Sequence, residues 1–300
     1  MTIEPPAPGE PRRPHGPRDP GDAWVVAPTG ERYWGRFGAA GLLAVDATRG
    51  VLLQHRVSWS HFGDTWALPG GARHEGETAC DGALREAAEE AGVPVAAVQP
   101  RVLSVFDLGY WSYTTVVGDV VVPFEPTISD PESRELAWVP VDEVTQYPLH
   151  PGFAASWEQL RGLLGVQPAV VVDVANVMGS VPDGWWRDRA GAASRLVARI
   201  SDLAARGVPA PALDLPEQTW YPRWTAVVEG QARGVESAPR VGVVRAEASG
   251  DDAILMAARG EVAAGRRVTV VTSDRALSDR VTDAGAAVRG TRWLLGLLEG

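Results

Sequence analysis

The sequence lacks lysine, so all 28 basic side chains among its 300 residues are arginine. It has one cysteine, Cys80, which excludes an internal disulfide, and no Cys and His residues have the spacing of a zinc site. This use of cysteine is typical of a reducing compartment, so we expect a cytoplasmic protein. The patterns GxGxxG and GxxxxGK are also absent, so neither a dinucleotide fingerprint nor a P-loop is indicated.

Positive charge is scarce in the first half of the chain. Residues 1–168 carry 12 Arg against 22 Asp and Glu, a net charge of −10, whereas residues 169–300 carry 16 against 16, a net charge of 0. Neither balance is that of a protein that binds duplex nucleic acid mainly through its phosphates. The halves differ in kind, and 300 residues are enough for two separate cores.

The first 22 residues contain seven prolines and no apolar run, so we expect a disordered, proline-rich tail over residues 1–22. They have the features of neither a signal peptide nor a membrane anchor, and we expect no membrane association. From Trp24 onward the pattern is globular.

Residues 23–166 have the pattern of a mixed α/β unit. The stretch GLLAVDATRGVLLQHR contains two apolar runs around a turn at Gly50, which predicts a β-hairpin. Thr78 as N-cap and Gly92 as stop predict a helix between them, with an apolar face made mostly of alanine. Strand-like and helical runs follow: RVLSVFDLG, YTTVVGDVVVPF, ELAWVPVDEV and HPGFAASWEQLRGLLG.

Residues 167–300 form a second unit in which strand and helix patterns alternate. It begins with AVVVDVAN, an apolar run typical of a strand buried on both faces of a parallel sheet. The alternation of later runs, such as WTAVVEG, DDAILMAARGEVAAG and RRVTVVTSD, predicts a Rossmann-like parallel α/β domain.

Three glutamates, Glu86, Glu89 and Glu90, are predicted to share one face of the first helix, because positions i, i+3 and i+4 are neighbours there. Carboxylates at that density suit Mg²⁺ or Mn²⁺, which complete their shells with water and substrate phosphate. The alternative is a solvated acidic face whose repulsion is tolerated.

The spacing around these glutamates resembles the Nudix box of the MutT-like nucleoside diphosphate hydrolases. Gly71 is followed after five residues by Glu77 and after seven more by Arg85-Glu86, and the stretch ends in Glu89-Glu90, one residue, Gly92. One departure is Ala87, where the family usually has a bulkier aliphatic residue. With WALPGG before it and ELAWVPVDEV after it, the resemblance covers about residues 24–165 and implies a Nudix αβα sandwich.

The resemblance also implies roles for single residues. Glu89, Glu90 and the backbone carbonyl of Gly71 would be ligands of Mg²⁺ or Mn²⁺, and Glu86 a ligand or the group that orients the water. A pair between Arg85 and Glu77 would fix the loop and helix, and a guanidinium beside carboxylates reduces their repulsion in any fold. The implied reaction is attack of metal-activated water on a phosphorus of a nucleoside diphosphate derivative.

Other side chains of this unit are weaker candidates. Glu132 and Glu135 are candidates for a general base, with solvated loop charges as the alternative. Trp66, Tyr110 and Trp111 are candidates for stacking on a nucleobase, with core or rim packing as the alternative. Many Nudix proteins are dimers, so a homodimer is consistent with the resemblance.

In the second unit, polar residues follow the ends of predicted parallel strands, whose carboxyl ends share one edge of a sheet. Their order resembles the NYN domains of the PIN-like ribonuclease superfamily over residues 168–300. This resemblance implies a divalent-metal phosphodiesterase site made of Asp173, Asn176, Asp251, Asp252 and Asp274. The alternative is ordinary strand-end and helix-capping aspartate.

Trp185, Trp186, Arg187 and Arg189 follow the first of these acidic positions and have the composition of a contact for single-stranded RNA, with core packing as the alternative. Together the patterns predict a Mg²⁺-dependent Nudix pyrophosphohydrolase that cleaves a nucleoside triphosphate or another nucleoside diphosphate derivative, such as an oxidised nucleotide. The alternative function is RNA processing, in which the second domain is the ribonuclease and the Nudix unit removes 5′ caps or senses nucleotides.

Overall fold

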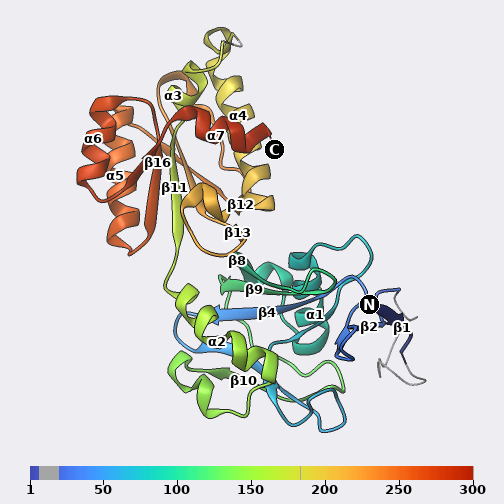
Figure 1. Ribbon diagram of the computed structural model, residues 1–300. Helices are drawn as coiled ribbons and strands as arrows, with labels where there is room; N and C mark the ends of the chain where they lie inside the picture. The colour runs from blue at the N-terminus through green and yellow to red at the C-terminus, as the bar shows by residue number, and fades with distance from the viewer. Residues whose placement is uncertain (7–19, 183, 300) are drawn as a thin grey trace. The chain divides into compact units, whose positions relative to one another are not determined.

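The computed structural model describes residues 1–6, 20–182 and 184–299, which divide into two compact units, Met1–Gly165 and Val166–Gly300 (Figure 1). Residues 7–19, within the expected disordered tail, lie outside the described residues. At the start of that tail, β1 (Thr2–Glu4) pairs with β2 (Trp24–Val26), which corrects the prediction for this stretch. All seven prolines follow Glu4, and Thr2 and Ile3 are β-branched, so a strand is favoured there.

The first unit contains a small sheet and a larger mixed sheet. The small one adds β3 (Arg32–Trp34) to β1 and β2. In the larger one the order is β10 (Ser133–Val139), β5 (Gly50–Arg56), β4 (Ala39–Asp46), β9 (Ser112–Val120), β8 (Val98–Asp107). The pair β4 and β9 is parallel and the others are antiparallel. The short strands β6 (Trp66–Ala67) and β7 (Gly70–Ala72) pair with β5 and β4.

Helix α1 (Ala79–Ala91) confirms the predicted caps. The Thr78 hydroxyl accepts the Asp81 N–H at 3.1 Å, and Gly92 ends the helix with a φ of 62°, which favours glycine. Ala83 and Ala87 are fully buried against sheet residues such as Leu42. These small side chains hold α1 close to the sheet, which fixes the position of its glutamates.

The remaining elements of this unit are η1 (Val95–Ala97), η2 (Val141–Gln146) and α2 (Pro151–Leu164). The strand expected from ELAWVPVDEV therefore ends at Val139, because Pro140 cannot donate to a strand ladder, and a 3₁₀ turn follows. Among the described residues, no helix has both the length and the apolar character needed to cross a bilayer.

Asp46 closes the turn between β4 and β5. Its carboxylate accepts the N–H groups of Thr48 and Arg49 at 2.9 and 3.0 Å and pairs with the Arg49 guanidinium at 2.8 Å. The Arg49 side chain, followed by the bonds from Thr48, outweighs desolvation and holds the pKa of Asp46 well below its usual range. The stabilisation from this group is therefore present above about pH 4 and is lost as the pH falls through the depressed pKa of the folded state.

We therefore expect Asp46→Ala to lower the free energy of unfolding by about 1–2 kcal/mol at pH 7, because several hydrogen bonds to a charged group are lost. The difference from the wild type should shrink at pH 3. Urea denaturation followed by circular dichroism measures both values. Asp142→Ala is the control, because Asp142 is exposed and its pair with Arg161 contributes little. If Asp46→Ala lowers the free energy of unfolding equally at pH 7 and pH 3, the stabilisation does not come from the ionised carboxylate of Asp46.

The second unit is built on a five-stranded parallel sheet, as predicted for a Rossmann-like domain. The strand order is β15 (Val241–Arg245), β14 (Arg223–Val228), β11 (Pro168–Asp173), β16 (Arg267–Val271), β17 (Ala287–Arg289). Each neighbouring pair is parallel. All six residues of β11 are buried, as the apolar run predicts for a central strand.

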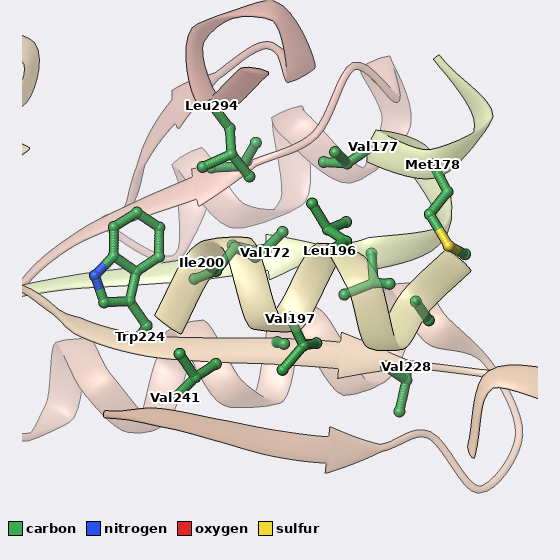
Figure 2. Close-up of a cluster of buried hydrophobic side chains, with 14 of the residues drawn as sticks. Val172, Val177, Met178, Leu196, Val197, Ile200, Trp224, Val228, Val241 and Leu294 are labelled. Atoms are coloured by element: carbon green, nitrogen blue, oxygen red, sulfur yellow. The ribbon is translucent and has the colours of Figure 1, made fainter. Parts of the chain in front are cut away.

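Helices cover both faces of this sheet (Figure 1). On one face lie α3 (Val174–Gly179), α4 (Arg189–Arg206) and α7 (Thr291–Glu299), and on the other lie α5 (Gly250–Ala263) and α6 (Arg275–Asp283). Leu196, Val197 and Ile200 of α4 pack with sheet residues such as Val172 and Trp224 (Figure 2). The connections contain η3 (Trp185–Arg187), η4 (Ala210–Leu213), η5 (Gly230–Gly234) and a hairpin of β12 (Val208–Pro209) and β13 (Thr219–Trp220).

Candidate functional site

The inner face of α1 carries two buried carboxylates. Glu86 and Glu90 retain 6% and 8% of their exposure, because positions i and i+4 point the same way, whereas the Glu89 side chain is 53% exposed. Within the described part of the chain, no three His, Cys, Asp or Glu side chains already stand in metal-holding geometry. The structure thus brings Glu86 and Glu90 together and leaves Glu89 at the solvent side.

Arg85 links all of the acidic residues predicted around it except Glu90. Its Nε and Nη2 donate to the two carboxylate oxygens of Glu77 at 2.8 and 3.0 Å. Its Nη1 donates to Glu86 at 2.8 Å and to Glu89 at 3.3 Å, and Nη2 also reaches the Ala72 carbonyl at 3.0 Å. Arg85 therefore ties the loop that contains Glu77 to the helix and to β7.

The charges of this cluster depend on one another. Burial by itself would lower the pKa of Arg85, but Glu77 and Glu86 outweigh it and raise the pKa above its usual value. Burial by itself would raise the pKa of Glu77, but Arg85 and the His74 N–H lower it. Arg85 and Glu77 are thus held as a charged pair. Within the part of the chain that the structure describes, Arg85 donates no hydrogen bond to Glu90.

Glu90 and Glu86 form a pair of buried carboxylates that a bound cation would stabilise in the charged form. Glu90 accepts the Gly70 N–H at 2.9 Å, yet burial, followed by the charge of Glu86, raises its pKa well above the usual value. The Glu86 carboxylate lies over Gly71, where a Cβ would be 2.8 Å from its atoms, so a larger residue at position 71 would displace that carboxylate. Two buried carboxylates beside the half-buried backbone of Gly70 and Gly71 fit the chemistry of a hard divalent cation.

Arg56, Tyr113 and Glu132 lie close to Glu90. The charge of Arg56 lowers the pKa of Glu90 and that of Glu132 raises it, and Arg56 Nη2 lies 3.9 Å from the Glu132 carboxylate. Burial and the charge of Glu90 raise the pKa of Tyr113. Glu135, in contrast, is exposed on β10, so the structure brings only Glu132 of the two base candidates to the cluster.

Arg56 was not among the site residues predicted from the sequence, although the alternation of residues along β5 points to it. In GVLLQHR, Leu52, Gln54 and Arg56 alternate onto the face that packs against α1. A charged residue that continues an inward-facing series is a candidate for a site.

The three stacking candidates have partners within the first unit. Trp66 is buried and stacks on His55 at 4.8 Å with an interplanar angle of 8°. Trp111 stacks on Tyr33 at 4.7 Å, and its indole N–H donates to the Trp34 carbonyl at 3.1 Å. Tyr110 is 36% exposed and contacts Tyr33 by its edge. The packing alternative therefore accounts for the positions of Trp66 and Trp111.

In the second unit, the carboxyl ends of the strands surround a cavity of about 520 Å³. Asp173, Asn176, Asp251 and Asp274 of the predicted set line it. Asp252 does not belong to the lining, because it points toward α6 and pairs with Arg280. The topology thus gathers four of the five predicted residues from three separate strand ends, as expected for a parallel sheet.

Hydrogen bonds hold this edge in place. The Asp173 carboxylate accepts the Asn176 N–H at 3.0 Å and the Thr272 hydroxyl at 2.9 Å, and the Asn176 side-chain oxygen accepts the Ser273 N–H at 2.8 Å. Asp274 caps α6 by accepting the Leu277 N–H at 2.8 Å. These aspartates are therefore both helix caps and lining residues.

Glu229 also lines the cavity and was not identified from the sequence. It follows the last residue of β14, so the strand-end rule that selected Asp173 applies to it as well. Its carboxylate accepts the Gly250 N–H at 3.0 Å at the start of α5. Burial raises the pKa of Asp173, and the negative charges of Asp251 and Glu229 add to this effect. The hydrogen bonds from Asn176 and Thr272 lower this pKa but do not outweigh the burial.

Residues 35–160 of the chain match the family model described as NUDIX domain. The chain is 50% identical over 154 residues to "Putative 8-oxo-dGTP diphosphatase 3" of Mycobacterium tuberculosis, strains CDC 1551 / Oshkosh and H37Rv. That match covers 48% of this chain and 70% of the relative.

Two further relatives match a similar share of the chain. A "Nucleoside triphosphate pyrophosphatase/Nudix hydrolase fusion protein" of Bifidobacterium longum is 38% identical over 156 residues, which cover 48% of this chain and 32% of that protein. The crystal structure of RenU, a Nudix hydrolase from M. smegmatis, is 47% identical and has a TM-score of 0.45, with 48% of this chain and 95% of that chain covered. The family match ends at residue 160, before the second unit begins.

Proposed function

Because the chain belongs to the Nudix family, we propose that its first unit is a divalent-cation-dependent pyrophosphohydrolase that cleaves nucleoside triphosphates, with 8-oxo-dGTP as the leading substrate. The observation that carries this proposal is the buried pair Glu86 and Glu90, in which Arg85 holds Glu86 over Gly71 and the Gly70 N–H holds Glu90. The name of the M. tuberculosis relative, 50% identical over 154 residues, supports the choice of substrate. We assign residues 23–166 to a Nudix αβα sandwich acting in the cytoplasm, and a homodimer stays a prediction.

Glu86, Glu89, Glu90 and the carbonyl of Gly71 are the groups that would hold Mg²⁺ or Mn²⁺. When bound, the cation supplies charge neutralisation at the phosphates and a more acidic water. Glu77 and Arg85 keep the loop before the helix in register with the carboxylates through two bonds of 2.8 and 3.0 Å. This rigidity holds the ligands near the geometry that the reaction needs.

We assign the role of proton acceptor to Glu132, because its carboxylate lies beside Arg56 and acts electrostatically on Glu90. The guanidinium of Arg56 offsets part of the negative charge of Glu132 and Glu90. Attack of water on a phosphorus would transfer a proton to this carboxylate and release a nucleoside monophosphate and pyrophosphate.

A second candidate function belongs to the second unit. The cavity lined by Asp173, Asn176, Asp251 and Asp274 favours a divalent-metal phosphodiesterase acting on single-stranded RNA, and residues 167–300 would then be a domain of the NYN/PIN-like type. Asp252, paired with Arg280, has at most a supporting role in this proposal. In such a protein the Nudix unit would remove 5′ caps or sense nucleotides.

One experiment separates the two functions. The full chain and its Glu89→Gln and Asp173→Asn variants are incubated with Mg²⁺ or Mn²⁺ and with nucleoside triphosphates, oxidised nucleotides, nucleotide sugars or single-stranded RNA, and all products are identified. We expect nucleotide hydrolysis in the wild type and in Asp173→Asn but not in Glu89→Gln. If the wild type leaves every nucleotide intact and cuts RNA only while Asp173 is present, the phosphodiesterase is the main function and the first proposal is wrong.

A further inference from the structure

The segment Gly184–Arg189, which leads from α3 into the first residue of α4, contains two tryptophans and two arginines, and we name it the Trp-Arg turn. Gly184 starts it with a φ of 83°, a conformation that favours glycine. The backbone bonds Arg187 N–H to Gly184 O, at 3.0 Å, and Asp188 N–H to Trp185 O, at 3.2 Å, close it. Asp188 then caps α4 by accepting the Gly191 N–H at 2.8 Å. The turn is thus fixed at the start of an 18-residue helix.

The two tryptophans of the turn differ in their environment. Trp185 packs on the main hydrophobic cluster of the second unit, and the guanidinium of Arg189 lies 5.3 Å from the centre of its ring. Trp186 contacts Trp185 by its edge at 6.3 Å and stays 55% exposed. An exposed indole held on a fixed turn is costly to leave in water, since large aromatics normally bury most of their area.

The Trp-Arg turn adjoins the rim of the cavity. Gly179 and Ser180, which line the cavity, form the end of α3, and a Cβ on Gly179 would lie 3.9 Å from the Trp185 ring. Arg187 and Arg189 are exposed on the same turn. The turn that carries the exposed Trp186 and the two guanidinium groups therefore adjoins, through Trp185 and Gly179, a cavity whose lining includes Asp173, Glu229, Asp251 and Asp274.

We propose that the Trp-Arg turn is a binding surface for single-stranded nucleic acid, in which a base stacks on Trp186 and Arg187 and Arg189 contact the phosphates. Stacking on an aromatic ring is open to any unpaired base, whereas a duplex hides the faces of its bases. Residues 169–300 have a net charge of 0, so these two guanidinium groups supply the local positive charge that contacts to phosphates need. The surface holds a strand beside the acidic cavity, and only the fate of that strand depends on the phosphodiesterase proposed above.

The test is fluorescence anisotropy of labelled 12-nucleotide single strands, RNA and DNA, with the full chain and EDTA, so that no cleavage occurs. Base stacking contributes roughly 1–3 kcal/mol, so Trp186→Ala should weaken binding about 5- to 160-fold, and Trp186→Phe should restore most of it. Arg187→Gln should lower the slope of log Kd against log salt by about 1. Trp59→Ala is the matched control, because Trp59 is 43% exposed in the first unit.

Binding of RNA, DNA or both that falls in Trp186→Ala and not in Trp59→Ala supports the proposal, and a preference for RNA identifies a contact to the 2′-hydroxyl. Absence of binding by the wild type at 50 mM salt, or an equal response of both tryptophan variants, overturns it. The phosphodiesterase is tested separately with Asp173→Asn. That variant should bind the strand like the wild type whether or not the wild type cleaves it when Mn²⁺ is added.

Discussion

Glu90→Gln should lower kcat/KM for nucleotide hydrolysis by roughly 10²- to 10³-fold, the effect typical of removing one group that stabilises charge in a transition state. The glutamine oxygen can still accept the Gly70 N–H, which Glu90 accepts at 2.9 Å, so the local geometry is kept. What is lost is the negative charge in a buried position beside Glu86. Steady-state kinetics at several Mg²⁺ concentrations measure the effect, and the loss should not be recovered at saturating Mg²⁺.

Glu158→Gln is the matched control for this prediction, because Glu158 lies exposed on α2 of the same unit. It changes the net charge by the same amount and should leave kcat/KM within twofold of the wild type, as expected of a surface substitution. Circular dichroism of both variants checks the fold. A folded Glu90→Gln enzyme with wild-type kinetics would show that Glu90 is a structural carboxylate only.

Arg85→Gln should lower the free energy of unfolding of the first unit by about 3 kcal/mol, the usual cost of removing one partner of a buried ion pair. The change takes away five donor contacts at 2.8 to 3.3 Å, to Glu77, Glu86, Glu89 and the Ala72 carbonyl. The buried Glu86 and the half-buried Glu77 then lose their cationic partner. Urea denaturation of the apo protein measures the loss, and Mg²⁺ should recover part of it because a cation replaces the missing charge.

Two further variants identify the cause. Arg85→Lys keeps the charge but not the fork that reaches both oxygens of Glu77, so it should recover less than half of the lost stability. In a double-mutant cycle, Arg85→Gln and Glu77→Gln should be strongly non-additive, since each removes the same pair. Additive effects would mean that Arg85 stabilises the unit through packing and not through Glu77.

Local signals in the sequence predicted helix α1 and its two ends correctly. Thr78, Gly92 and the alanine face act within one helix, so caps, limits and orientation follow from neighbouring residues. The exposure of Glu89 did not follow in this way. Glu86 and Glu89 both accept a hydrogen bond from Arg85 Nη1, yet only Glu86 is buried, and the depth of a side chain is decided by tertiary contacts.

In the second unit, the sequence predicted at which edge of the sheet the polar residues gather, but not which of them line the cavity. The rule that parallel strands end at one edge selected Asp173 and Asp274, and both line the cavity. The same rule did not tell Asp251 from Asp252, because one residue along a helix turns the side chain by about 100°, here toward Arg280. Glu229 was missed because a glutamate before glycine at a strand end looks like an ordinary turn.

The most direct measurement is hydrolysis of 8-oxo-dGTP and dGTP by the full chain with Mg²⁺, with products separated and kcat/KM compared between the wild type and Glu89→Gln. We predict that the wild type releases pyrophosphate and the nucleoside monophosphate, prefers the oxidised nucleotide, and loses this activity in Glu89→Gln. Release of single phosphates, or an equal rate in Glu89→Gln, would contradict a Nudix pyrophosphohydrolase centred on the α1 carboxylates.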